Sequence, residues 1–180
     1  MDPVAAVRSG FNKYVRESSD SVNQVADQVD VLKAQVSALV NPLQRQIVAQ
    51  MQQDLDNIGA ALLSSVAQLQ AVSKIIYNAG HFPCEYIRAS GGVGHRICNV
   101  LFNQASEKVD EAWAEINNAQ GYVRSMMAFF INNDGAPTAE AETVTVMHTK
   151  RLLVGSVELA AEALDEARPL VNEAVSILED

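Results

Sequence analysis

The sequence contains few of the residues that build most catalytic and metal-binding sites. Its 180 residues include three histidines, two cysteines and one tryptophan, and aromatic side chains make up only 6%. No E-x-x-H pair occurs, because the residues three positions before the histidines are Asn78, Gly92 and Thr145. This excludes the iron or manganese carboxylate sites that some helical bundles hold. A G-x-S-x-G nucleophile motif is also absent. We therefore expect a protein that is not an enzyme.

Basic residues and long apolar runs are also scarce. There are 13 Lys and Arg against 22 Asp and Glu, which gives a net charge of −9. Nucleic-acid binders need a basic stripe to replace the counterions of the phosphate backbone, so we expect no nucleic acid as a partner. No apolar run approaches the roughly 20 residues that span a bilayer, and no N-terminal run resembles a signal sequence. The sequence thus predicts no transmembrane segment. It leaves a secreted protein in its mature form, which we favour, or a cytoplasmic one.

Apolar residues make up 48% of the chain and recur at alternating steps of three and four residues, the spacing of one face of an α-helix. Four such runs predict helices over residues 3–40, 42–79, 95–131 and 138–178. Pro42 suits the start of the second helix and Gly80 its end. Short connections favour antiparallel neighbours. We therefore predict an all-α fold: one domain over residues 1–180, an elongated up-down-up-down bundle of four long helices. Five or six shorter helices would result if one or more of the four break, and Pro169 in the last one is the strongest reason to expect a break.

Special chemistry is concentrated in the connection predicted over residues 80–98. There His81, Cys84, His95 and Cys98 form the pattern H-x2-C-x10-H-x2-C, and two imidazoles with two thiolates can bind zinc tetrahedrally. We favour a disulfide between the two cysteines, because closing a loop of about 15 residues contributes roughly 3 kcal/mol. Structural zinc sites also use other pairs more often. Zinc remains the alternative cofactor, and free thiols are a third possibility. The run SGGVGHR could attract an anion, but it lacks the ending of a phosphate-binding loop.

Large apolar side chains gather mainly on the predicted third helix. Those that could line a ligand are Phe102, Trp113, Met127 and Phe130. Such a stripe is typical of a core face and can also form the wall of a binding site. The apolar stripes of the predicted helices are wider than a two-in-seven coiled-coil seam. The first functional hypothesis is therefore a non-catalytic carrier, which holds an apolar small molecule or lipid between its helices in an extracellular setting.

The charge pattern supports other functions. Residues 138–180 include nine acidic and three basic side chains, and runs such as ELAAEALDEA are typical of a solvated acidic helix face. Such a face could dock a basic protein. The regular spacing from Val4 to Leu39 also permits self-association. The alternative hypotheses are a structural or protein-interaction bundle with an acidic docking face, and an adaptor module that zinc holds together.

Overall fold

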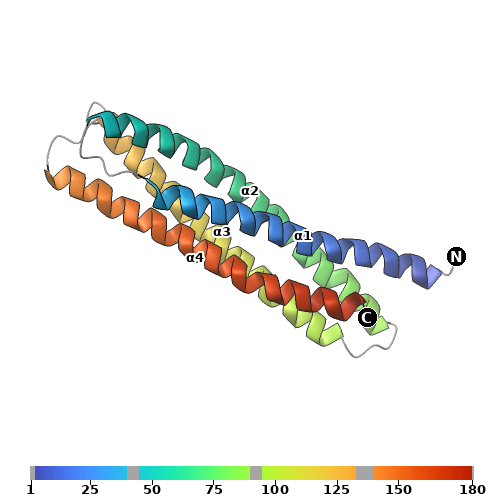
Figure 1. Cartoon of the computed structure of the whole chain (residues 1–180). Helices are drawn as coiled ribbons and strands as arrows, with labels where there is room; N and C mark the ends of the chain where they lie inside the picture. Colours follow the sequence, from blue (N-terminus) through green and yellow to red (C-terminus); the bar gives the residue numbers. More distant parts are fainter. Residues whose placement is uncertain (1–2, 40–44, 90–94, 133–139, 180) are drawn as a thin grey trace. The chain divides into compact units, whose positions relative to one another are not determined.

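Four long helices make up the described part of the chain. The computed structural model describes the backbone of residues 3–39, 45–89, 95–132 and 140–179. Side-chain surroundings are described for residues 16–39, 50–79, 98, 100–129 and 145–177. The helices are α1 (Pro3–Ser37), α2 (Arg45–Ala89), α3 (His95–Asn132) and α4 (Glu140–Glu179), drawn in Figure 1 as four uninterrupted ribbons. The described ranges contain no strand. The prediction of an all-α helical bundle is confirmed.

The largest difference from the predicted boundaries lies at the end of α2. We expected the helix to end at Gly80 and a Cys/His loop to fill residues 80–98. Instead, α2 continues to Ala89 and α3 begins at His95. A glycine inside a helix costs only about 1 kcal/mol, so Gly80 alone is not enough to end one. The connection between α2 and α3 is therefore limited to residues 90–94.

Helix α4 contains Pro169 in its interior and is not broken by it. The helix runs from Glu140 to Glu179, so the alternative of five or six helices is not found in the described ranges. Pro169 is exposed, and so is Asp165, the residue whose carbonyl oxygen loses its helical donor. That oxygen lies on the solvent side of the helix, where water can bond to it.

Contacts between residues divide the chain into two compact units, each built from parts of all four helices. Unit 1 comprises Met1–Asp27, Gln68–Ala112 and Glu162–Asp180, and unit 2 comprises Gln28–Ala67 and Trp113–Ala161. The chain therefore passes from one unit to the other four times, each time inside a helix. That both belong to a single domain stays a prediction.

Hydrogen bonds within unit 1 give the direction of its helices. Ser19 of α1 contacts Asn172 of α4, and four residues later the carbonyl oxygen of Asn23 accepts a bond from Arg168. Residue numbers rise along α1 while they fall along α4, so these helices are antiparallel. The other neighbours in sequence are joined by short connections, which also favours antiparallel packing. The predicted up-down-up-down order follows.

Mainly aliphatic side chains fill the core of each unit. The buried apolar residues of unit 1 include Val22, Val25, Leu69, Ile76, Phe102, Val109, Leu164 and Val171. Those of unit 2 include Val29, Leu32, Leu55, Ile58, Leu62, Ile116, Val123 and Leu153. Nearly all of these residues lie in the three-four runs read from the sequence. Helical spacing therefore identified most of the core.

Two predicted core positions of α3 are displaced by one residue. The sequence places Trp113 in the stripe of large apolar side chains typical of a core face, but it is 36% exposed, and the alanine before it, Ala112, is fully buried. Likewise Met126 is buried and Met127 only half-buried. Close-packed helices leave room for an alanine methyl at the seam but not for an indole ring. The tryptophan therefore lies at the edge of the core.

Candidate functional site

The predicted Cys/His site lies mostly outside the described side chains. Cys98 is buried on α3. The side chains of His81, Cys84 and His95 are outside the described set, although Cys84 falls within α2 and not in a loop. Among the described residues, no group of three or more His, Cys, Asp or Glu could hold a metal ion. The described residues contain no disulfide, so the disulfide and its zinc alternative both stay predictions.

The predicted ligand-lining residues do not surround one described cavity. Phe102 is 1% exposed in the core of unit 1. Trp113 and Met127 belong to unit 2, where both are partly exposed, and Phe130 lies outside the described side chains. None of them lines either of the two cavities considered next.

One small cavity lies between α1 and α2 in each unit. The cavity of unit 2 has a volume of about 190 Å³ and is lined by Gln35, Ala38, Asp54, Asn57 and Ile58. The cavity of unit 1 has a volume of about 140 Å³ and is lined by Ser21, Gln24, Val25, Gln68, Ala71, Val72 and Ile75. The Oε1 atom of Gln68 is buried and accepts no hydrogen bond from the described part of the chain. Both cavities have mixed polar and apolar walls, and their size suits a few water molecules and not a lipid, because ligand pockets usually exceed about 300 Å³.

A lysine joins α3 to α4 in unit 1. Lys108 Nζ lies 2.9 Å from Glu166 Oε2 on α4 and 3.3 Å from Glu111 Oε2 on its own helix. These hydrogen bonds, first the one to Glu166, raise the pKa of Lys108. The ammonium group therefore stays charged and offsets part of the acidic charge on these two helices.

An arginine joins α4 to α1 in the same unit. Arg168 Nη2 donates to Asp27 Oδ1 at 2.7 Å and to the carbonyl oxygen of Asn23 at 3.3 Å. The Arg168 side chain is 28% exposed. The guanidinium thus holds two helices together at the edge of the core, a structural role.

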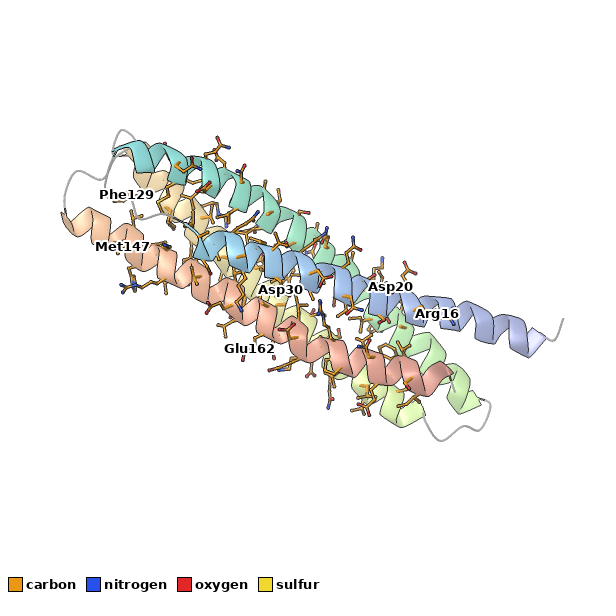
Figure 2. The ribbon with its side chains drawn as sticks, viewed as in Figure 1. Arg16, Asp20, Asp30, Phe129, Met147 and Glu162 are labelled. Atoms are coloured by element: carbon orange, nitrogen blue, oxygen red, sulfur yellow. The ribbon has the colours of Figure 1, made fainter. Side chains whose placement is uncertain are left out.

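Exposed acidic side chains are numerous on both units' helices. Figure 2 labels three of them, Asp20 and Asp30 on α1 and Glu162 on α4. On α3 and α4 of unit 1 the exposed acidic residues are Glu107, Asp110, Glu111, Glu162, Asp165, Glu166 and Glu173. Lys108 engages only Glu111 and Glu166 of this group. Most of these carboxylates therefore remain available to a basic partner.

The outer surface of α2 is different, because it lacks charge over several turns. No charged residue occurs from Asn57 to Ser73, and within this stretch Leu63 is 65% exposed. A second three-four run lies on this exposed side, which we call the outer seam of α2. Its members, all exposed, are Asp56, Ala60, Leu63, Ala67, Gln70 and Lys74. Helical spacing alone did not predict this seam, although the long uncharged stretch is a signal that could have found it.

The same helix accounts for the one apolar segment of membrane-spanning length in the described residues. Within Gln50–Ala79 an 18-residue window has a mean hydropathy of 1.2, which is sufficient to span a membrane by length and composition only. A single such helix is weak evidence, because the core helix of a bundle passes the same test. The described part of the chain therefore has no clear transmembrane segment.

The chain matches no model of a known protein family and no curated protein.

Proposed function

We propose that the chain is a non-catalytic structural and protein-interaction bundle, which meets its partner on the outer surface of its helices. The observation that supports this most directly is the contrast between the two sides of α2. Leu62 is fully buried among aliphatic side chains, whereas Leu63 is exposed on an uncharged stretch. The two cavities between α1 and α2, of about 190 and 140 Å³, are smaller than usual ligand sites. Recognition on the exterior fits this distribution best.

The charges of unit 1 favour basic protein partners. Lys108 is shared between two glutamates, but exposed carboxylates such as Glu107, Glu162 and Asp165 form no ion pair within the described part of the chain. Complementary charge at an interface accelerates encounter and suppresses wrong partners. An acidic docking face on α3 and α4 of unit 1 therefore belongs to the proposal.

We also propose an extracellular setting with a disulfide between Cys84 and Cys98. The register of α2 and α3 in unit 1 supports the pair, since Ser73 Oγ lies 3.0 Å from Asp110 Oδ1. Eleven residues onward along α2 is Cys84, and twelve residues back along α3 is Cys98. In antiparallel helices these positions lie at nearly the same level, as a disulfide requires. Two free thiols per chain in the purified protein would contradict the pair.

A carrier of an apolar small molecule or lipid is the second candidate. It is supported by the apolar composition of α2, in which an 18-residue window within Gln50–Ala79 has a mean hydropathy of 1.2. If the helices separated, their aliphatic faces could cover an apolar guest. Such a carrier must open its core to bind.

The single tryptophan can distinguish the two candidates. Trp113 lies at the edge of the core of unit 2, so opening of the bundle around lipid would move its indole ring into an apolar environment. An interaction bundle with a closed core predicts no change in Trp113 emission when oleate or phosphatidylcholine vesicles are added. Native mass spectrometry of the purified chain should then show the polypeptide mass alone. A blue shift of the emission together with bound lipid would refute the interaction bundle and establish the carrier.

A further inference from the structure

We infer that the chain forms a symmetric dimer, in which the outer seam of α2 packs antiparallel against the same seam of a second copy. The inference rests on the proposed function, because it identifies one partner for the exterior of the bundle. The surface involved is a face of one helix that no other element covers within the described residues.

The outer seam has the spacing of a helix-packing face. From Asp56 to Lys74 its members follow each other at steps of four, three, four, three and four residues. The two ends are eighteen positions apart, which is five whole turns at 3.6 residues per turn. This follows from helical spacing alone, since α2 runs without interruption from Arg45 to Ala89. Alternation of threes and fours is the pattern that lets one helix pack along another.

The side chains of the seam complement each other in an antiparallel pair. When two α2 helices are aligned with their two-fold axis at the level of Ser65, Leu63 of each copy lies opposite Ala67 of the other. A large apolar side chain then meets a small one, and the contact occurs twice. Ala60 lies opposite Gln70, so no two bulky residues collide. Alternation of large and small side chains is what allows close packing.

The charges at the ends of the seam select the direction of pairing. In the same alignment Asp56 of one copy lies opposite Lys74 of the other, at both ends of the contact. Neither residue forms an ion pair within the described part of the chain. Parallel pairing would instead bring like charges together, which is unfavourable. A protein with a net charge of −9 repels its own copies over most of its surface, and the uncharged stretch between these ends is where two copies can approach.

The length of the seam predicts a weak, reversible dimer. Five turns of helix extend about 27 Å, and the seam contains one large apolar residue per copy. The area buried by such a contact falls at the lower end of specific interfaces, which bury about 1,200 Å² or more. Association should therefore become visible only at high protein concentration.

Sedimentation equilibrium of the purified full chain in reducing buffer tests the dimer. Concentrations up to about 1 mM are needed, because contacts of this size are weak. We expect the weight-average mass to rise from 19.5 kDa toward twice that value. Leu63→Glu should keep the mass at 19.5 kDa throughout. Leu159→Glu, a substitution at an exposed leucine of α4, is the matched control and should associate like the wild type.

A charge exchange tests the direction of pairing without changing the apolar contact. Asp56→Lys should weaken association at least about tenfold, because it places two lysines opposite each other. Adding Lys74→Asp to that variant should restore the wild-type association constant. Circular dichroism should give the same helix content for every variant.

Three results would overturn the inference: a monomer at every concentration, a dimer that persists in Leu63→Glu, or a double variant no better than Asp56→Lys. None of them would by itself refute the proposed function, which fails instead if the chain binds lipid and shifts its Trp113 emission.

Discussion

Lys108 and Arg168 show what single charged residues do in this protein. Each reaches from its own helix to a neighbour in unit 1, Lys108 to Glu166 on α4 and Arg168 to Asp27 on α1. Both side chains are only partly exposed, with their aliphatic stems along the edge of the core. Ion pairs of this kind fix the register of packed helices and leave the interior without charge.

The raised pKa of Lys108 makes a prediction about alkaline pH. The pKa of Lys108 is higher in the folded chain than in the unfolded chain, so the charged ammonium group stabilises the fold. This contribution is present at lower pH and is lost as the pH rises through the folded-state pKa. The difference in unfolding free energy between wild type and Lys108→Met should therefore be constant from about pH 7 to pH 9 and shrink above about pH 10.4, the ordinary lysine value. Urea titrations at each pH measure it.

Arg151→Met provides the control for this series, because Arg151 is exposed and forms no ion pair within the described residues. Its difference from wild type should stay close to zero at every pH. A Lys108 difference that grew with rising pH would contradict the assigned hydrogen bonds.

At the scale of the element, α2 shows both the reach of helical spacing and its limit. The spacing correctly identified its buried face, which includes Leu55, Leu62 and Ile76. It did not identify the outer seam as a second packing face. Both faces follow the same three-four spacing, and the packing of the other helices decides which of them turns inward. Gly80 was misread for a different reason: a breaking residue is weak against the continued packing of a long helix.

Pro169 leads to a prediction for α4. The proline removes one backbone hydrogen bond from an exposed helix interior, so Pro169→Ala should raise the unfolding free energy by about 1–3 kcal/mol. Thermal unfolding followed by circular dichroism measures the change. Ser176→Ala, at another exposed position of α4, gains only helix propensity and should add no more than about 0.5 kcal/mol. Equal effects of the two substitutions would mean that the helix does not continue through Pro169.

At the scale of the whole molecule, composition determines what kind of function is possible. A core of valine, alanine and leucine permits close helix packing, and the two cavities between α1 and α2 are small, at about 190 and 140 Å³. Trp113, expected in this core, lies at its edge, since helices packed through Ala112 leave it no room. The net charge of −9 and the uncharged stretch of α2 then divide the exterior into surfaces of different character. Sequence alone gave the composition of these surfaces, but it did not show which residues are exposed.

Two adjacent leucines of α2 provide the most direct test of the central claim, that this helix has one face in the core and another free for a partner. Leu62→Ala should lower the unfolding free energy by about 2–5 kcal/mol, because Leu62 is 0% exposed and its removal leaves a cavity. Leu63→Ala should change it by no more than about 0.5 kcal/mol when the protein is dilute enough to be monomeric. Urea unfolding of the two variants side by side measures both values. Equal losses, or a larger loss for Leu63→Ala, would contradict the account.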